Sequence, residues 1–265
     1  MEQAVLQMNH VNIAYEQECV VKDFSIQVQP GEILGIVGES GGGKSTVIRA
    51  AMGLLENRGR VTDGEIIYKG MSVTGATDEE LRAIRGPEMG MIFQSAALFD
   101  SMTVLDNVMF PLNMFSNDTL RERTKRAMFC LDRVNLGEAK DKFPGEISGG
   151  MQKRVAIARA IALNPQYLFC DEPNSGLDPK TSLVIDDLIH DITQEYNMTT
   201  IINTHDMNSV LGIGEKVIYI YEGHKEWEGT KDDIFTSTNE RLNNFIFASD
   251  LLRKVKDVEV QGMEG

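Results

Sequence analysis

The stretch from Gly38 to Thr46 has the residue types and the spacing of a loop that binds phosphate. Its glycines let successive backbone N–H groups turn toward one anion, and the helix expected after it adds the positive end of its dipole. Lys44 can then reach the outer phosphates of a nucleotide, and the Ser45 hydroxyl can ligate Mg²⁺. The alternative is a glycine-rich turn with an exposed lysine. We expect these residues to contact the nucleotide: Gly38, Glu39, Ser40, Gly41, Gly42, Gly43, Lys44, Ser45 and Thr46.

Two adjacent carboxylates, Asp171 and Glu172, follow the apolar run 167–170. Successive residues of a strand point to opposite sides of the chain. Asp171 can therefore lie in the Mg²⁺ shell while Glu172 faces the last phosphate and the water that attacks it. The alternative is a strand that ends in solvated acids, and the apolar run before the pair disfavours it.

Gln94 and His205 also follow predicted strands, at 89–93 and 200–204. Residues of these types at a strand end are usually structural. Beside a phosphate site, however, the Gln94 amide can contact both Mg²⁺ and the attacking water, and His205 can sense the last phosphate. We therefore treat Gln94 as a candidate metal ligand and both residues as candidate catalytic residues.

A second candidate anion site comprises Ser148, Gly149 and Gly150, which precede a helix predicted from Val155 to Leu163. Two helix starts of this kind suggest two bodies that close on one nucleotide, whereas a capped helix after a flexible turn is the alternative. Tyr15 ends a predicted strand, where its ring can stack on a purine. The alternative is an edge-strand tyrosine that packs locally.

The elements that must position these residues follow from the spacing of apolar residues. We expect an antiparallel β-layer over 5–30, a buried strand over 33–37, a helix over 46–52, helices over 104–115 and 120–134 with a cap at Asn117-Asp118, a hairpin over 217–227, and an amphipathic helical stretch from Lys231 with Leu242, Phe245, Ile246 and Leu251 on one face. The helical segment over about 97–145 is then an insertion into an α/β core.

The composition limits the function classes. The net charge of −14 argues against non-specific binding of nucleic acid and against a polybasic membrane anchor. No apolar run approaches the ~20 residues of a membrane-spanning helix, and the N-terminus lacks a signal pattern. Cys19, Cys130 and Cys170 show no metal-ligand spacing, so we expect reduced thiols. These features predict a cytosolic chain that reaches a membrane only through a partner.

In this order, the motifs resemble those of the ATP-binding-cassette (ABC) ATPases over nearly the whole chain. The matching motifs are Walker A at Gly38–Ser45, the Q-loop at Gln94, the signature at Ile147–Met151, Walker B at Tyr167–Asp171 with Glu172 as the catalytic carboxylate, the D-loop at Ser175–Asp178, the switch histidine His205, and Tyr15 at the adenine-stacking position. The resemblance also implies that Asp178 lies at the nucleotide.

The resemblance implies a RecA-like P-loop NTPase core of the α/β class with an antiparallel β-subdomain and an inserted α-helical subdomain. We expect the ABC ATPase domain at residues 1–240, with the core and β-layer at 1–96 and 151–240 and the helical subdomain at 97–150. A C-terminal helical tail is expected at 241–265.

The implied activity is Mg²⁺-dependent hydrolysis of ATP by in-line attack of water. Lys44 and the loop amides hold charge, Glu172 polarises the water, and the expected metal ligands are Ser45, Gln94 and Asp171. The implied partners are a second copy of the chain, arranged head to tail so that two ATPs are sandwiched, and an integral membrane permease. The permease would hold the chain at the cytoplasmic face of the inner membrane. No nucleic acid partner is expected.

A narrower resemblance concerns the run 93–108 and Met151 in the signature, where glutamine is usual. Both are similar to the ATPase subunits of Mla-type transporters, which carry phospholipids between the membranes of diderm bacteria. This predicts phospholipid transport and a periplasmic lipid-binding partner. The alternatives are an importer of an amino acid or other small solute and a cell-division-type ATPase that does not transport. ATPases of DNA repair or translation fit less well, because no coiled coil or second cassette is present.

An apolar cluster follows the Q-loop and consists of Leu98, Phe99, Met102, Val104 and Phe110. In the family, this region receives a short helix of the membrane subunit. We expect at least some of these side chains to form a docking groove. The alternative is that they pack the helical subdomain.

Overall fold

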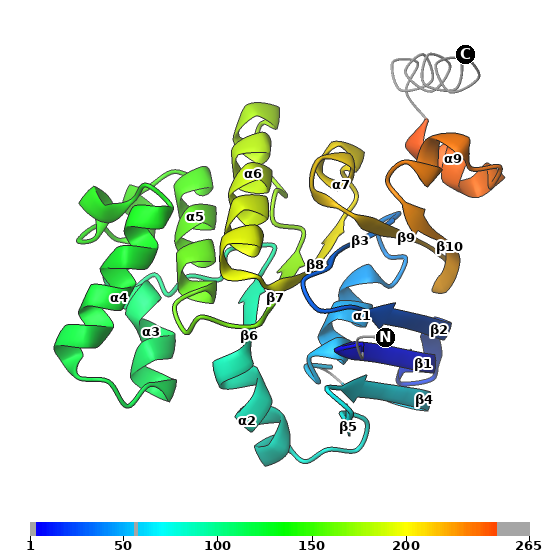
Figure 1. The fold of residues 1–265 in the computed structure, drawn as a ribbon, viewed down its shortest axis with the longest axis horizontal. Helices are drawn as coiled ribbons and strands as arrows, with labels where there is room; N and C mark the ends of the chain where they lie inside the picture. The colour runs from blue at the N-terminus through cyan, green and yellow to red at the C-terminus, as the bar shows by residue number, and fades with distance from the viewer. Residues whose placement is uncertain (1–3, 56–57, 248–265) are drawn as a thin grey trace. The chain divides into compact units, whose positions relative to one another are not determined.

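The computed structural model describes residues 4–55 and 58–247 of the chain. These residues form two compact units (Figure 1). Unit 1 is built from the chain before Gly75 and after Ile202, and unit 2 is Gly75–Ile202. Both units combine strands with helices, and the sheets contain parallel and antiparallel pairs. The α/β class predicted from the sequence is therefore confirmed.

Unit 1 contains an antiparallel sheet with the strand order β2-β1-β4-β5. Its strands are β1 (Leu6–Tyr15), β2 (Glu18–Val28), β4 (Gly59–Tyr68) and β5 (Met71–Ser72). The pairing of β1 with β2 runs from Leu6 opposite Val28 to Tyr15 opposite Glu18. This sheet is the β-layer expected near the N-terminus, and β1 ends at Tyr15, as predicted.

Three further strands of unit 1, in the order β10-β9-β3, lie beside one another. They are β3 (Ile33–Gly38), β9 (Lys216–Tyr221) and β10 (His224–Thr230). Every residue of β3 is buried, which explains its continuous apolar run, because a parallel strand is covered on both faces. It pairs in parallel with β9, and β9 and β10 form the predicted hairpin. Helix α1 (Lys44–Ala51) follows β3 after a short loop.

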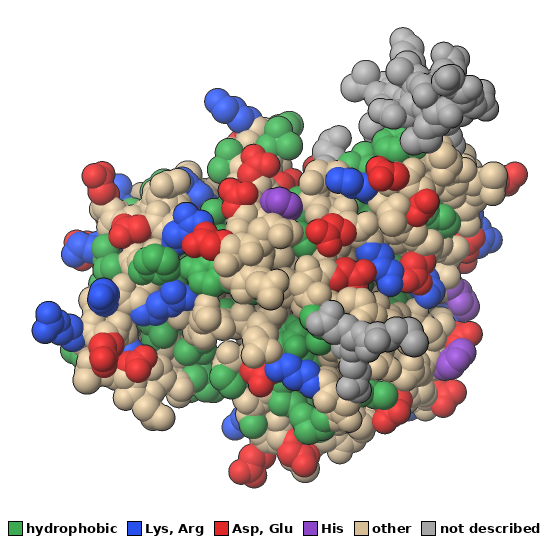
Figure 2. Space-filling model, in the orientation of Figure 1, with side chains coloured by type: hydrophobic (Ala, Val, Ile, Leu, Met, Phe, Trp, Pro, Cys, Tyr) green, Lys and Arg blue, Asp and Glu red, His purple; other side chains and the backbone are tan. Residues whose placement is uncertain are grey.

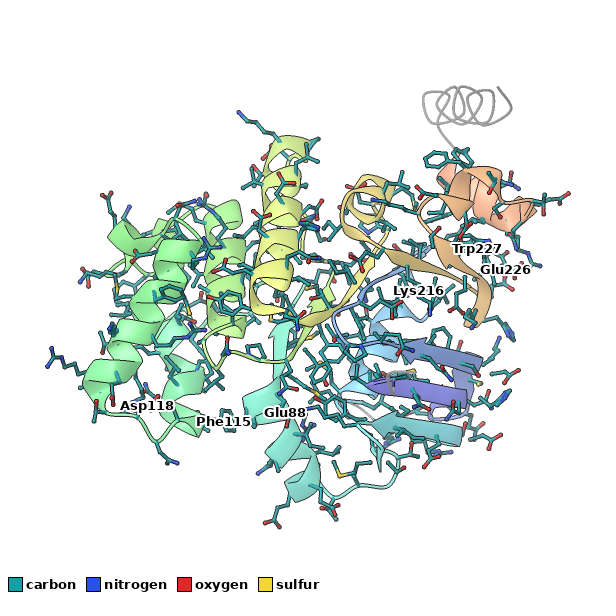
Figure 3. The ribbon with its side chains drawn as sticks, viewed as in Figure 1. Glu88, Phe115, Asp118, Lys216, Glu226 and Trp227 are labelled. Carbon is teal, nitrogen blue, oxygen red and sulfur yellow. The ribbon has the colours of Figure 1, made fainter. Side chains whose placement is uncertain are left out.

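The end of the described chain folds back onto this hairpin. It contains α8 (Asp233–Thr236) and α9 (Glu240–Ile246), and α7 (Met207–Ile213), which precedes the hairpin, shares the same apolar cluster. Arg241 donates to Glu226 at 2.8 Å and lies over the Tyr221 ring, 4.6 Å from its centroid. Trp227 follows Glu226 on β10 (Figure 3) and packs against one apolar cluster.

The amphipathic face predicted after Lys231 is confirmed in part. Leu242 and Ile246 are buried in the same cluster as Trp227, and Phe245 packs against it. Leu251 and the rest of the expected helical tail from residue 248 lie outside the described residues.

Unit 2 begins with α2 (Asp78–Glu88) and contains the strands β6 (Met89–Ile92), β7 (Tyr167–Asp171) and β8 (Thr199–Thr204). The three strands follow the order β8-β7-β6, and β6 pairs with β7 in parallel. The chain passes from unit 2 into unit 1 within β8, at Asn203. The remaining helices of unit 2 are α3 (Val104–Phe115), α4 (Leu120–Arg133), α5 (Gly149–Ala160) and α6 (Pro179–Tyr196).

The helices predicted over 104–115 and 120–134 are confirmed as α3 and α4, but the predicted cap of α4 is wrong. Thr119 caps the helix, because its hydroxyl accepts from the Glu122 N–H at 3.4 Å and the Glu122 carboxylate accepts from the Thr119 N–H at 2.9 Å. This reciprocal capping box satisfies two donors at once. Asp118 instead accepts from the Ser116 hydroxyl at 2.7 Å.

The apolar cluster after the Q-loop divides between core and surface. Val104 is fully buried at the start of α3, so for this residue the packing alternative is correct. Phe99 is 41% exposed and lies against the Phe110 ring, with 4.7 Å between centroids.

Acidic and basic side chains are interspersed over the face of the molecule shown in Figure 2. Within the described residues, no helix has the length and apolar character needed to cross a membrane.

Candidate nucleotide site

The loop between β3 and α1 in unit 1 has the local geometry that an anion site requires. Gly38 has φ +153°, and a Cβ at this position would lie 2.2 Å from the carbonyl oxygen of Ile220, so only glycine fits. Gly43 precedes α1 with φ +100°. Helix α1 has no side-chain cap and no acidic residue in its first turn. The positive end of its dipole is therefore not neutralised by its own side chains.

Lys44 is only 4% exposed, so the alternative of an exposed lysine is wrong. Its ammonium donates to the carbonyl oxygens of Gly38 and Glu39, both at 2.9 Å. The cation is thus folded onto the loop that it would share with a phosphate group. A buried ammonium beside a loop of backbone amides favours a negatively charged ligand.

Two other candidates of unit 1 lie at the ends of strands. Tyr15 is half-buried at the end of β1, and His205 is exposed directly after β8. Inside β8, the fully buried Asn203 donates to the Ser45 hydroxyl at 3.3 Å. Sequence reasoning missed Asn203, although an amide side chain within the predicted buried strand 200–204 was the available signal.

The carboxylate pair of unit 2 lies at the end of β7. Asp171 is 4% exposed and is the last residue of the strand. Glu172 follows with φ +47°, in the left-handed region. The expected alternation along a strand is therefore wrong for Glu172, because the strand ends before it. Left-handed backbone at a residue other than glycine costs about 1–3 kcal/mol and clusters at functional sites.

Gln94 is brought together with Glu172 and Ser175. Its amide donates to Glu172 Oε2 at 3.1 Å and to the Ser175 hydroxyl at 3.1 Å. Sequence reasoning named Gln94 and Glu172 but gave Ser175 no role of its own. The backbone N–H of Ser175 donates to the Glu172 carbonyl at 3.1 Å, and this turn explains how Ser175 comes close to Gln94.

A buried cation, Lys153, accompanies this group. It is 5% exposed, and its ammonium donates to the main-chain oxygen of Gln94. Burial lowers the pKa of Lys153, while the charges of Glu172 and Asp171 act in the opposite direction. The sequence offered no signal for this residue other than its position in the helix after the signature.

Helix α5 begins at Gly149, earlier than the predicted start at Val155, because Ser148 caps it. The Ser148 hydroxyl accepts from the Met151 N–H at 3.3 Å. The capped helix offered as the alternative is therefore present, and a cap of this kind leaves the hydroxyl proton available to another acceptor. A Cβ on Gly150 would lie 2.7 Å from Thr181 Cγ2, so α5 and α6 approach closely here.

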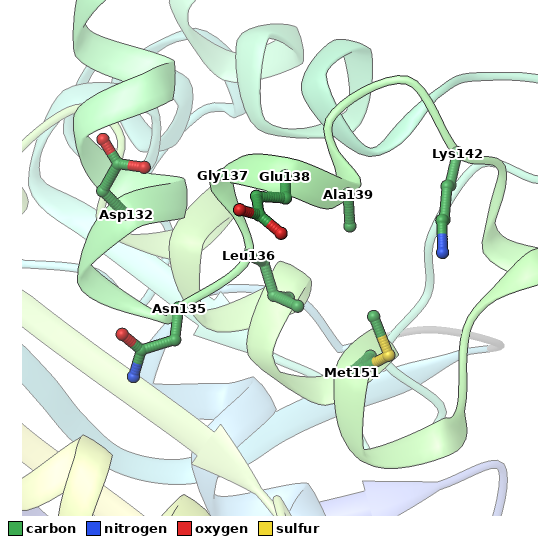
Figure 4. A pocket seen from close by; sticks show the side chains of 8 residues that line it. All are labelled: Asp132, Asn135, Leu136, Gly137, Glu138, Ala139, Lys142 and Met151. Carbon is green, nitrogen blue, oxygen red and sulfur yellow. The ribbon is translucent and has the colours of Figure 1, made fainter.

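Met151, which stands where glutamine is usual, projects toward a cavity of about 620 Å³ (Figure 4). The cavity lies within unit 2 and is lined by Asp132, Asn135, Leu136, Gly137, Glu138, Ala139, Lys142 and Met151. Met151 therefore contributes to the lining of this cavity, and its backbone N–H donates to the Ser148 hydroxyl.

Asp178 caps α6 in the same way. Its carboxylate accepts from the Thr181 N–H at 3.1 Å and from the Thr181 hydroxyl at 2.5 Å. These bonds lower the pKa of Asp178, with the hydroxyl bond as the largest cause. Contact of Asp178 with a nucleotide stays a prediction.

The candidate metal ligands suit Mg²⁺ that arrives with a nucleotide. The described residues contain no group of three His, Cys, Asp or Glu side chains placed to hold a metal ion. Magnesium in nucleotide sites takes one or two carboxylates and completes its shell with waters and phosphate oxygens. Asp171 in unit 2 is such a carboxylate, and the Ser45 hydroxyl of unit 1 and the Gln94 amide of unit 2 also carry oxygen donors. Ligation of one Mg²⁺ by these three residues stays a prediction.

A sequence model of the family described as "ABC transporter" matches residues 21–175. The methionine import ATP-binding protein MetN of Clostridioides difficile is 38% identical over 91% of this chain and 74% of its own length. The protein of the same name from Carboxydothermus hydrogenoformans is 40% identical over 85% of this chain and 67% of its own length.

A solved structure is also similar. The dimeric ATP-binding cassette MJ0796, bound to ADP and Pi in a post-hydrolysis state, superposes with a TM-score of 0.78. It is 33% identical, and the match covers 85% of this chain and 98% of that chain.

Proposed function

This chain belongs to the ABC transporter family as an ATP-hydrolysing, nucleotide-binding subunit, and on that premise we propose that it powers the import of an amino acid. Its fold is the ABC ATPase fold, an α/β architecture with mixed sheets. The observation that carries the proposal is that relatives 38% and 40% identical are named methionine import ATP-binding proteins. We take methionine as the first substrate to test.

The proposed chemistry assigns roles to residues of both units. The ammonium of Lys44 exchanges the loop carbonyls for oxygens of the outer phosphates, with Gly38–Thr46 around them. The carboxylate of Glu172 accepts a proton from the attacking water while the oxygen of that water bonds to the γ-phosphorus. The bond between the γ-phosphorus and the β–γ bridging oxygen breaks, and ADP leaves. Gln94 orients that carboxylate through the observed 3.1 Å hydrogen bond. Bound Mg²⁺ supplies charge neutralisation on the phosphates, and its proposed ligands are Ser45, Gln94 and Asp171.

The remaining site residues are proposed to act around the same nucleotide. Tyr15 stacks on the adenine, and His205 senses the last phosphate. Ser148, Gly149, Gly150 and Asp178 serve the nucleotide bound by a second copy. The dimeric state of the similar cassette supports this arrangement, and an α5 N-terminus capped by an uncharged serine side chain suits an anion.

We propose that the chain lies at the cytoplasmic face of the inner membrane, where an integral membrane permease holds it. The family supplies the reason, because ATP hydrolysis needs a membrane partner to become transport. Opening and closing of the ATPase dimer would drive the permease.

Phospholipid transport is the second candidate. The run 93–108 and Met151 favour it through their resemblance to Mla-type ATPases, and it would require a periplasmic lipid-binding subunit. The names of the similar proteins favour the amino acid instead.

Transport in cells that carry Glu172→Gln separates the two candidates. For methionine import, uptake of labelled methionine should fall at least about tenfold, since loss of general-base assistance typically costs 10²–10⁴ in rate. The phospholipid composition of each membrane should stay unchanged. Cys19→Ser, an exposed substitution outside the site, serves as the control. Normal methionine uptake with altered phospholipid distribution would favour the lipid candidate.

A further inference from the structure

Helix α5 holds the backbone of the segment Gln94–Ala97 within unit 2. The Arg159 guanidinium donates to the carbonyl oxygen of Ala97 at 2.6 Å and to that of Ala96 at 2.8 Å. Lys153, nearly two turns earlier on the same helix, donates to the carbonyl oxygen of Gln94. Two side chains of one helix thus donate to three main-chain carbonyls of this four-residue segment.

The segment that α5 holds has an unfavourable backbone. Ala96 has φ +61° and Ala97 has φ +47°, so two successive alanines lie in the left-handed region. This conformation is disfavoured for residues with a Cβ and persists only where the surroundings enforce it. A planar guanidinium donates two hydrogen bonds in a fixed geometry and therefore suits two neighbouring carbonyls.

The conformation of the segment sets the direction of the Gln94 side chain. The Gln94 amide donates to Glu172 Oε2 and to the Ser175 hydroxyl, each at 3.1 Å. A rotation of the 94–97 backbone would break both contacts, because the side chain of Gln94 starts from that backbone.

We propose that Arg159 and Lys153 are positioning residues, which hold the Gln94–Ala97 backbone in its left-handed turn and thereby aim the Gln94 amide at Glu172. The signature residue Ser148 caps the start of helix α5. The same helix therefore connects the signature to the carboxylate that is to polarise water. The inference rests on the catalytic role proposed for Glu172.

The test uses the full chain with Mg²⁺-ATP and begins with Arg159→Lys. A lysine keeps the charge but cannot bond both carbonyls in one plane, so kcat should fall about tenfold while KM for ATP changes less than about twofold. Adding Ala97→Gly to the Arg159→Lys variant should raise kcat at least about threefold above that of Arg159→Lys alone, since glycine adopts positive φ without strain. Ala97 is exposed, so the second change opens no cavity.

Arg126→Lys is the matched control. The Arg126 guanidinium also donates to two neighbouring carbonyls, those of Ala162 at 2.9 Å and Ile161 at 2.8 Å. These carbonyls lie directly after α5 and not in the Gln94–Ala97 segment. The control should lower the melting temperature about as much as Arg159→Lys and change kcat less than about twofold, since only packing is affected.

Hydrogen exchange of a peptide covering 94–97 gives a readout that does not depend on Glu172. Exchange should quicken in Arg159→Lys and slow again in the double variant. Wild-type kcat in Arg159→Lys, an equal kcat loss in Arg126→Lys, or no recovery with Ala97→Gly would overturn the inference. If Glu172→Gln keeps wild-type turnover while the exchange pattern appears as expected, the proposed role of Glu172 fails and the positioning of the segment stands.

Discussion

Three residues with left-handed backbone in unit 2 belong to the candidate catalytic carboxylate or to the segment that bonds it. Ala96 and Ala97 adopt left-handed conformations two and three residues after Gln94, and Glu172 adopts one directly after β7. Gln94 and Glu172 are joined by a hydrogen bond of 3.1 Å. Strain of this kind is retained where an exact side-chain direction is needed, which favours Glu172 over a merely solvated acid.

Glu172→Gln should trap an ATP-bound dimer. The amide keeps the size of the side chain but cannot accept the proton of the attacking water, so turnover should fall by about 10²–10⁴. Steady-state ATPase assays and size-exclusion chromatography in ATP measure the two effects. Wild-type turnover in this variant would remove the proposed role.

The three cysteines should differ in reactivity. Cys19 is exposed, whereas Cys130 and Cys170 are buried. Burial raises the pKa of Cys130 to about 11 and also raises the pKa of Cys170. Because the thiolate is the reactive form, an aromatic disulfide reagent at pH 8 should modify one thiol quickly, and Cys19→Ser should abolish that phase.

The sign of the accompanying pH effect follows from proton linkage. The pKa of Cys130 is raised from 9.0 to about 11 in the folded chain. Between these values the folded chain keeps a proton that the unfolded chain has lost, so the contribution of Cys130 to stability falls as pH rises from about 9 to about 11. In urea unfolding, the free energy of unfolding of the Cys130→Ala variant should fall less steeply with pH across that range than that of the unaltered chain. Equal slopes for both chains would contradict the assignment.

At the residue scale, the sequence was most informative where chemistry needs a fixed spacing. Gly38, Lys44, Gln94 and Glu172 were predicted because loop, strand end and carboxylate pair each have a recognisable pattern. Asn203, Ser175 and Lys153 were not, because their contacts arise from tertiary packing that no local pattern encodes.

At the scale of elements, α5 is placed by contacts at both ends. Ser148 caps its start, Gly150 allows close approach to α6, and Arg126 bonds the carbonyls that follow it. The helices α3 and α4 were predictable from apolar spacing. The N-cap of α4 was harder to predict, because Asn117, Asp118 and Thr119 are all favourable cap residues. Only the reciprocal bonds between Thr119 and Glu122 decide between them.

Gly150→Ala should destabilise the chain by about 1–3 kcal/mol, although alanine normally favours a helix. The new methyl group would lie 2.7 Å from Thr181 Cγ2. The Thr181 side chain cannot rotate away without losing its 2.5 Å hydrogen bond to Asp178. Urea unfolding measures the change.

The matched control is Gly149→Ala, where the nearest atom, Leu177 Cδ2, would lie 3.9 Å from the new Cβ. This variant should be neutral or slightly stabilised. Adding Thr181→Ser to the Gly150→Ala variant removes Cγ2 and keeps the hydroxyl that donates to Asp178. This second change should restore most of the stability that Gly150→Ala loses. Failure of this rescue would show that the clash lies elsewhere.

At the scale of the whole molecule, the fold class was predictable, because alternating apolar strands and helices leave few other architectures. The substrate was not. The run 93–108 predicted phospholipid, whereas the similar proteins are named for methionine import. One fold hosts many functions, and residues that serve a nucleotide carry little direct information on a transported substrate.

Ser148→Arg should abolish ATP hydrolysis and leave ATP binding by the monomer nearly intact. In the proposed arrangement, an arginine at this helix start would block the face offered to the nucleotide of a second copy. Ser148→Ala is the control, because it also removes the cap of α5, at a cost of about 1 kcal/mol, without adding bulk. A nucleotide titration decides the matter, since a large loss of monomer affinity would mean that Ser148 acts on its own nucleotide.

Phe99→Asp should separate the chain from its permease. Phe99 is 41% exposed and lies on the Phe110 ring, and its backbone is held by Asn107, which accepts from the Phe99 N–H at 2.8 Å and donates to its carbonyl at 3.1 Å. An exposed aromatic ring on a fixed backbone suits a helix of a membrane partner. The aspartate would place a charge in that contact, and a pull-down with the permease should lose most of the bound partner.

Loss of the permease is evidence for docking only if the isolated Phe99→Asp chain remains folded. Because the backbone contacts of Asn107 do not depend on the Phe99 ring, the variant should keep its circular dichroism spectrum and its ATP affinity. Phe129→Asp on α4 is the matched control, since Phe129 is 45% exposed but lies against Arg126 and not near the Q-loop segment. It should retain the permease. Loss of the permease in both variants would indicate a general surface effect, and retention in both would place docking elsewhere on the chain.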